Sequence, residues 1–292
     1  AMKRCLVGSE MCIRDSSVYG SDGFTGLGGE KVTLTDTSIG NVADLNTLNG
    51  YTTGNVDASN ISSITGAISA LNIAYAADSA LGNGISGLGN EALVLSDSGT
   101  VTDVAALTTL NGNTTGTINA DSIGDFEASI SDLNTMYAGA VDSGDGITNI
   151  GDKGVAITDT TVSDASTLNT LNGYTSGVVT ADGVTALTGT ASVLNTLLTA
   201  GNDTEQFSTN SFASLATATV SDSTLSIAHL NGAIAQANTA TGKTTLADGA
   251  TVFSVSSGAT INTGNESAFT TLLDSEDDGL IAVSYTHLRA HE

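Results

Sequence analysis

The stretch "VTLTDTSIGNVADLNTLNGYTTGNVDAS", residues 32–59, decides the fold of this chain because two related stretches follow it. They read "LVLSDSGTVTDVAALTTLNGNTTGTINAD" from Leu93 and "VAITDTTVSDASTLNTLNGYTSGVVTAD" from Val155. Starting points that lie about 61 residues apart indicate a tandem repeat, in which each unit completes its core against its neighbours.

Each repeat unit has two arms of unequal length. Leucines that precede Asn, or a residue in its place, recur alternately 26 and 35 or 36 residues apart, and they are Leu45, Leu71, Leu107, Leu133, Leu168, Leu194 and Leu230. The longer arm also contains a glycine-rich segment, found at residues 20–31, 81–92 and 143–154. In the last long arm this segment has diverged into "NDTEQFSTNSFASLA".

The long arm reads as a strand followed by a helix. Residues 32–36 alternate apolar and hydroxyl side chains and are rich in β-branched residues, which predicts a strand. Val42, Leu45 and Leu48 have helical spacing, with Ser38 or Asn41 as the expected N-cap and Gly50 as the expected end.

The short arm reads in the same way. Residues 52–59 predict a second short strand, and "ITGAISALNIAYA" predicts a second helix with Ile64, Ile68, Leu71 and Tyr75 on one face. In the third unit we expect Ser163 and Thr188 to cap the two helices. Because helices connect successive strands, the strands are expected to be parallel.

We therefore predict an α/β solenoid of short parallel strands that alternate with short helices. The alternative is a β-solenoid in which the "LNTLNG" segments are bulging turns, since Asn, Thr and Gly dilute the helical propensity of these segments.

Both ends of the chain are interpreted as translated sequencing-adapter DNA. "LVGSEMCIRD", from Leu6 to Asp15, and "VSYTHLRAHE", from Val283 to Glu292, are encoded by the two complementary strands of one adapter sequence. We therefore exclude residues 1–16 and 283–292 from the fold. Tandem repeats are expected over 17–205, and 206–282 is expected to be a diverged repeat or the start of another module. The natural reading frame is expected to continue beyond both ends.

The remaining insert is strongly acidic and contains no cysteine, because Cys5 and Cys12 lie in the excluded leader. Without Glu10, Asp15 and Glu292, 28 of the 31 acidic residues remain, against three lysines. Nucleic-acid binding requires cations that displace counterions from phosphates, so it is excluded as a function. No apolar run is long enough to span a membrane.

Two repeated polar positions have structural interpretations. The Asn of "LNTLNG" is expected to hydrogen-bond backbone between neighbouring turns, rather than to bind a ligand. Asp36, Asp97 and Asp159 end the strands of successive long arms, so we expect them to form caps or Asx-turns.

The glycine-rich loops are the candidate calcium sites. They place Asp22, Asn83 and Asp145, and then Glu30, Glu91 and Asp152, in turns that glycine permits, and Ca²⁺ prefers such oxygen ligands. Neither the nonapeptide calcium pattern nor the twelve-residue calcium-binding loop is present, so no residue is assigned as a metal ligand. His229 has no second histidine or cysteine in the insert and is interpreted as a surface residue. We assign no catalytic or cofactor-binding residue and expect no enzyme.

The segments "LNTLNGYTTG", "SALNIAYA" and "GISGLGNEA" resemble the tandem repeats of very large secreted or cell-surface proteins of marine bacteria, including cyanobacteria, which are often described as adhesin-like. The resemblance covers residues 20–198 and implies an extracellular spacer or adhesive stalk. Its expected partners are neighbouring repeats and cell-surface or environmental glycans. The alternatives are a calcium-binding surface module and, ranked last because the threonines are not in strict register, a carbohydrate or ice-surface binder.

Overall fold

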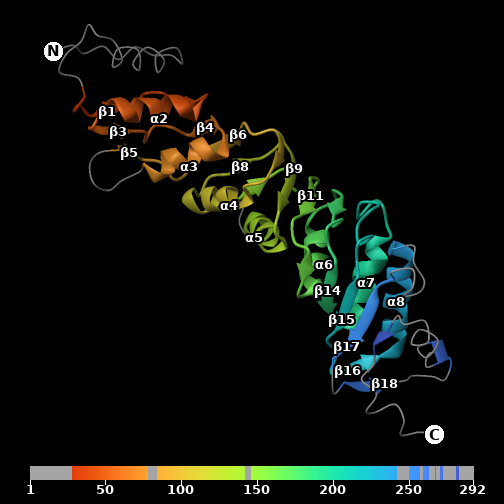
Figure 1. Cartoon of the computed structure of the whole chain (residues 1–292). Helices are drawn as coiled ribbons and strands as arrows, with labels where there is room; N and C mark the ends of the chain where they lie inside the picture. The colour runs from red at the N-terminus through yellow and green to blue at the C-terminus, as the bar shows by residue number, and fades with distance from the viewer. Residues whose placement is uncertain are drawn as a thin grey trace. The chain divides into compact units, whose positions relative to one another are not determined.

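The structure is a computed structural model that describes residues 28–77, 84–141, 146–241, 250–256, 259–262, 267, 270, 271, 281 and 282. The two ends that we interpret as adapter-derived, 1–16 and 283–292, lie outside these residues. The described chain is α/β, with short parallel strands that alternate with helices (Figure 1). No helix in these ranges is long and apolar enough to cross a membrane.

The described residues form seven helices, each preceded by one or more short strands. The helices are α2 (Val42–Tyr51), α3 (Ile68–Ala76), α4 (Val104–Asn113), α5 (Ile130–Val141), α6 (Ala165–Tyr174), α7 (Ala191–Gly201) and α8 (Ile227–Thr241). We call the segments that end in α2, α4, α6 and α8 long arms, and those that end in α3, α5 and α7 short arms.

The strands are two to six residues long. They are β1 (Val32–Thr33), β2 (Ser38–Ile39), β3 (Asn55–Asp57), β4 (Ser63–Gly66), β5 (Gly84–Ser86), β6 (Ala92–Leu95), β7 (Gly99–Val101), β8 (Ile118–Asn119), β9 (Ile123–Ala128), β10 (Ile147–Thr148), β11 (Gly154–Ile157), β12 (Thr161–Val162), β13 (Val179–Thr180), β14 (Ala186–Gly189), β15 (Thr217–Val220), β16 (Thr224–Ser226), β17 (Val252–Val255), β18 (Thr260–Asn262) and β19 (Ile281–Ala282).

The chain divides into two compact units. Unit 1 comprises residues 1–125 and 135–150, and unit 2 comprises 126–134 and 151–292, so the division passes through β9 and α5. Each unit contains complete long and short arms.

In unit 1 the strands of successive arms pair side by side. One sheet has the order β1-β3-β5 and another has the order β10-β8-β6-β4-β2. The second sheet has one buried aliphatic residue from each strand in register, and these residues are Ile39, Ile64, Leu93, Ile118 and Ile147. Parallel pairing therefore joins each arm to the next and builds a continuous apolar layer.

In unit 2 the order β12-β14-β15-β17-β19 repeats this arrangement. Val162, Leu187, Ala218 and Phe253 form its buried row. β15, β17 and β19 lie within 206–282 and extend the sheet that begins with β12, so these three strands continue the parallel pairing of the repeats.

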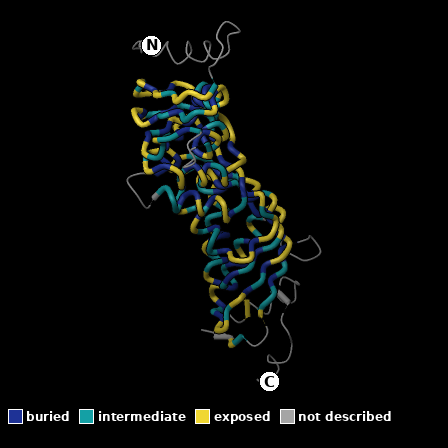
Figure 2. The backbone as a smooth tube through the Cα atoms, turned by 90° about the vertical axis from the view of Figure 1, so that its left-hand side faces the viewer, coloured by how far each residue is buried: buried dark blue, intermediate teal, exposed yellow. Residues whose placement is uncertain are grey.

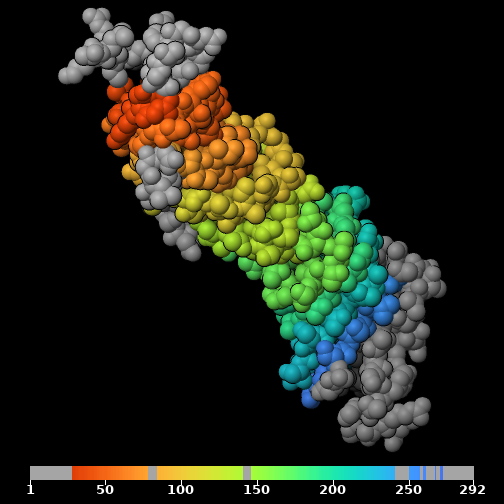
Figure 3. Space-filling view, turned by 60° about the vertical axis from the view of Figure 1, so that its left-hand side comes forward, coloured from red at the N-terminus to blue at the C-terminus, as the bar shows by residue number. Residues whose placement is uncertain are grey.

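The helices of each unit lie side by side, α2 to α4 in unit 1 and α6 to α8 in unit 2 (Figure 1). None of the seven recurring leucines is more than 2% exposed. Buried positions recur along the described chain, with exposed positions between them (Figure 2). Successive arms of unit 1 pack directly against one another (Figure 3). The core is thus a layer between strands and helices, filled mainly by aliphatic side chains.

The helical interpretation of the "LNTLNG" segments is confirmed, because they lie within α2 and α6, with the equivalent "LTTLNG" in α4. The alternative that made them turns is wrong. Val42, Leu45 and Leu48 are buried as predicted, and Asn41 caps α2 by accepting a hydrogen bond from the Ala43 N–H at 3.1 Å. α2 ends at Tyr51, one residue beyond the predicted Gly50.

Other predicted boundaries are wrong. Ile64 lies in β4 rather than in a helix, because Ser63–Gly66 pairs with strands on both sides and α3 begins only at Ile68. In the third sequence repeat, Asp164 caps α6 and Thr190 caps α7. The predicted caps Ser163 and Thr188 lie before these helices.

The diverged segment of the last long arm replaces glycine with aromatic packing. Phe207 and Phe212 are fully buried, with ring centroids 5.4 Å apart, and Phe207 forms a parallel bridge with Val179. Phe212 has a φ of 62°, a costly conformation for a bulky residue. Its ring occupies the space that a Cβ on Gly201 would need.

Candidate functional site: the glycine-rich loops

Each glycine-rich loop is held by the turn that follows the long-arm helix. The turn reads Thr-Thr-Gly in the first two sequence repeats and Thr-Ser-Gly in the third repeat. Backbone N–H groups of Thr53, Thr115 and Ser176 donate to the carbonyls of Gly28, Gly89 and Gly151 at 2.6, 2.8 and 2.8 Å. The contact spans 25 or 26 residues of sequence in every unit, so it is a repeated feature of the fold.

The first threonine of the turn makes a second contact with the loop. The hydroxyls of Thr52, Thr114 and Thr175 donate to the carbonyls of Glu30, Glu91 and Lys153 at 2.8, 3.4 and 2.6 Å. The same hydroxyls accept the N–H of the turn glycine, at 2.9 Å in each unit. Each hydroxyl therefore links the loop and the turn.

The turn glycines lie against the loop backbone. A Cβ on Gly54, Gly116 or Gly177 would overlap the backbone of Glu30, Glu91 or Lys153. Glycine is therefore required at these positions for the close approach of two backbones.

The carboxylates of the first two loops bind their own backbone. Oε2 of Glu30 accepts the N–H groups of Gly28 and Gly29 at 2.6 and 3.1 Å. Oε2 of Glu91 accepts those of Gly89 and Asn90 at 2.8 and 3.2 Å. The hydrogen bond from Gly28 is the main reason that the pKa of Glu30 is lowered.

The second loop also buries its carboxylate. Glu91 is fully buried, and the Tyr75 hydroxyl from α3 donates to its Oε2 at 2.7 Å. Burial, followed by this hydrogen bond, raises the pKa of Tyr75 above its ordinary value. Tyr75 is therefore a neutral donor at physiological pH, and the pair holds the loop against α3.

The third loop has different chemistry on the same backbone. Lys153 takes the position of Glu30 and Glu91, which corrects the sequence-based alignment of Asp152 with those glutamates. Tyr137, which corresponds to Tyr75, donates to the Ile150 carbonyl at 3.1 Å. Asp152 lies 3.9 Å from the Lys153 ammonium, and 76% of its side chain is exposed.

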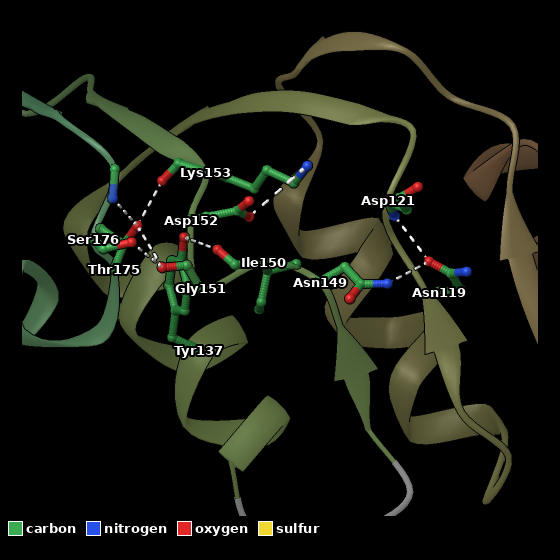
Figure 4. Close-up of polar contacts among 11 residues, drawn as sticks. Asn119, Asp121, Tyr137, Asn149, Ile150, Gly151, Asp152, Lys153, Thr175 and Ser176 are labelled. Atoms are coloured by element: carbon green, nitrogen blue, oxygen red, sulfur yellow. Dashed lines mark hydrogen bonds and ion pairs between the residues drawn. The ribbon is translucent and has the colours of Figure 1, made fainter.

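Figure 4 shows the third loop and its surroundings. In unit 2, Thr175 and Ser176 point toward the loop backbone. In unit 1, Asn149 donates to Oδ1 of Asn119 at 2.9 Å, and Asn119 also accepts the Asp121 N–H at 2.9 Å. These contacts join backbone turns through side-chain amides and hydroxyls.

The predicted calcium ligands are not brought together among the described residues. Asp22, Asn83 and Asp145 lie outside the described ranges. Glu30 and Glu91 accept amide hydrogen bonds from their own loops. Within the described residues, no group of three or more His, Cys, Asp or Glu side chains could hold a metal ion.

The repeated asparagines link neighbouring helices, and for Asn46 and Asn169 of "LNTLNG" this is the backbone contact that the sequence predicted. Nδ2 groups of Asn46, Asn72, Asn134 and Asn169 donate to the carbonyls of Ala70, Ala106, Thr167 and Val193 at 2.8, 2.9, 2.9 and 3.3 Å. Each acceptor directly precedes the recurring leucine of the next helix. At the equivalent place in α4, the Thr108 hydroxyl instead donates to Val104 of its own helix.

The repeated aspartates are helix caps, but of a different helix from the expected one. Asp97 and Asp159 accept the first N–H of α3 and α5, the helices of the preceding short arms. Asp36 occupies the same sequence position in the first unit. His229 lies on α8 and is exposed.

The sequence did not single out Tyr75 and the Thr-Thr-Gly turn as one site. A usable signal was present, since "NIAYA" and "NTMYA" place Tyr75 and Tyr137 at the repeat spacing. No protein-family model and no curated protein matches the chain, so the site is interpreted from its geometry.

Proposed function

We propose that this chain is a non-enzymatic structural repeat, a spacer or adhesive stalk segment of a large extracellular or cell-surface protein, built as an α/β solenoid. One observation carries the proposal: asparagine, threonine and aspartate side chains that recur with the repeat are hydrogen-bonded to the backbone of another arm. Asn72, Thr114 and Asp97 are examples in unit 1. Residues that recur with such contacts serve the stacking of arms.

Strand pairing supports the same proposal. Ile64 pairs with Ile39 of the preceding arm and with Leu93 of the following arm. A structure in which every arm contacts its neighbours can be lengthened by adding units, without a change in its existing contacts. This property suits a spacer, whose function depends on length.

The charge of the chain supports a role at an exposed surface. The formal net charge is −24 at pH 7. Among the seven described helices, two acidic residues are present, Asp44 and Asp132. A high net charge of one sign keeps a long chain soluble and limits unwanted association. The resemblance to secreted repeats points to the same setting.

The test lengthens the chain by one repeat. A second copy of residues 93–154, inserted after Gly154, joins the repeats in phase. Because strands lie about 4.8 Å apart and packed helices about 8–10 Å apart, two added arms should increase the maximum dimension by about 10–20 Å. Small-angle X-ray scattering of both full chains measures this increase. An unchanged maximum dimension would contradict the solenoid and the spacer role.

Chelation separates this proposal from the calcium-dependent alternative. We expect the melting temperature of the full chain to be the same in EDTA and in millimolar Ca²⁺. A melting temperature that falls on chelation would favour the calcium-binding module.

A further inference from the structure

The helices of long and short arms begin with caps of different origin. Asn41, Asp103 and Asp164 precede α2, α4 and α6 and accept hydrogen bonds from the first turn of their own helix. These three residues are exposed. Each long-arm helix therefore carries its cap in its own arm.

The short-arm helices receive a carboxylate from the next long arm. Oδ2 atoms of Asp97, Asp159 and Asp222 accept the N–H groups of Ile68, Ile130 and Ala191 at 2.8, 2.7 and 2.6 Å. The donors are the first residues of α3, α5 and α7, and each aspartate lies 29 or 31 residues later in the chain. All three aspartates are partly buried, unlike the exposed caps of the long arms.

These carboxylates provide what short-arm helices lack. A helix of nine to twelve residues is marginal by itself, and the N–H groups of its first turn need acceptors. A carboxylate at the N-terminus both accepts a hydrogen bond and interacts favourably with the helix dipole. The short-arm helix gains this stabilisation only when the following long arm is in place.

The three helices depend on the following arm to different degrees. α3 has Ala67 at its N-cap, with no side-chain cap of its own. In α5 the Ser129 hydroxyl accepts the Asp132 N–H at 3.1 Å, and in α7 the Thr190 hydroxyl accepts the Val193 N–H at 3.3 Å. α3 is therefore the most dependent of the three.

A second contact joins the same arms. Asn72 of α3 donates to the Ala106 carbonyl of α4, and Asn134 of α5 donates to the Thr167 carbonyl of α6. Both the carboxylate and the amide thus connect a short arm to the long arm that follows it. The junction of α2 with α3 has the amide contact from Asn46 to Ala70.

We propose that Asp97, Asp159 and Asp222 give the repeat a direction of folding, in which each short-arm helix, α3 most of all, reaches its full stability only after the next long arm has docked. A short arm and the following long arm then form one cooperative unit. When a long arm opens, the opening spreads to the short arm on its N-terminal side. This behaviour is additional to the proposed spacer role and does not depend on it.

The test is residue-resolved hydrogen exchange of the full chain carrying Asp97→Ala. We expect amide exchange in α3, more than 20 residues upstream of the substitution, to become about fivefold faster, since loss of a cap typically costs about 1 kcal/mol and each 1.4 kcal/mol is about tenfold. Asp103→Ala is the matched control, because Asp103 lies six residues away and caps α4 of its own arm. The control should accelerate exchange in α4 first.

Graded variants keep the test decisive if Asp97→Ala folds poorly. Asp97→Asn retains an acceptor oxygen and should accelerate exchange in α3 by only about twofold to threefold. Asp159→Ala should accelerate amide exchange in α5 less than Asp97→Ala does in α3. The double variant Ser129→Ala and Asp159→Ala should accelerate exchange in α5 as much as Asp97→Ala does in α3. The proposal is overturned if the Asp97 variants accelerate exchange in α4 as much as in α3, or leave α3 unchanged.

Discussion

The second and third glycine-rich loops have the same backbone contacts and opposite charges at the same place. Glu91 is fully buried and accepts hydrogen bonds from Tyr75 and from its own loop, whereas Lys153 lies beside the exposed Asp152. In both loops a threonine hydroxyl and a turn glycine hold the backbone. The repeat therefore preserves these threonine and glycine contacts, which we call the backbone clamp, while the charged side chain can change.

The largest difference between the loops is expected on removing the charged side chain. Glu91→Ala leaves the buried Tyr75 hydroxyl and the Gly89 N–H without their acceptor, so we expect a loss of about 2–4 kcal/mol in the free energy of unfolding. Lys153→Ala should cost about 1 kcal/mol or less. Urea unfolding of the full chain measures both, and Glu91→Gln, which keeps an acceptor, should lie between them. Equal losses of unfolding free energy for Glu91→Ala and Lys153→Ala would contradict the distinction between the buried carboxylate and the lysine.

Substitution of the turn glycine should affect both loops alike. Gly116→Ala and Gly177→Ala place a Cβ against the backbone of Glu91 and Lys153, so each should destabilise the fold by about 1–3 kcal/mol. Gly112→Ala and Gly173→Ala are matched controls, because a Cβ there meets no atom within 4 Å. The controls should be neutral or stabilising by up to about 1 kcal/mol. If the turn variants and the controls have equal stability, the clamp is not a shared requirement.

Removal of the tyrosine hydroxyls should again separate the loops. Tyr75→Phe breaks a hydrogen bond to a buried carboxylate and should cost about 1.5–3 kcal/mol, while Tyr137→Phe breaks one to a carbonyl and should cost about 0.5–1.5 kcal/mol. The unfolding free energies of both variants, measured in the same buffer, give the comparison. A larger cost for Tyr137→Phe would reverse our assignment of the stronger contact.

The smallest effect is a pH dependence in the first loop, where Glu30 is exposed. Its pKa is lowered from 4.5, mainly by the hydrogen bond from the Gly28 N–H. The ionised form of Glu30 is therefore favoured in the folded chain. It stabilises the fold at pH values above the pKa that Glu30 has in the unfolded chain. This stabilisation is lost as the pH falls through the lower pKa that Glu30 has in the folded chain. Glu30→Gln should remove this dependence below pH 4.5, and a carboxyl NMR titration of Glu30 should give a midpoint below 4.5. A midpoint at or above that value would contradict the hydrogen-bonded geometry.

The repeat, the two-arm organisation and the α/β class follow from the order of residues along the chain. These properties depend on spacing: recurring leucines place Leu45 and Leu48 on one helical face, and "VTLTD" alternates as a strand does. The structural role of the repeated asparagines followed in the same way, because a polar residue that recurs with the core is best explained by contacts between units.

Which residues meet across arms depends on how the arms pack, and local sequence does not specify it. Asp97 looked like a cap for its own arm, and its contact with Ile68 depends on how one arm lies against another. Ile64 has helical spacing to Ile68, but pairing with strands on both sides places it in β4. Periodicity and turn propensity depend on residues that are close in sequence. The partner of an aspartate or of a short strand instead depends on packing between residues of different arms, which lie 25 to 36 positions apart in the sequence.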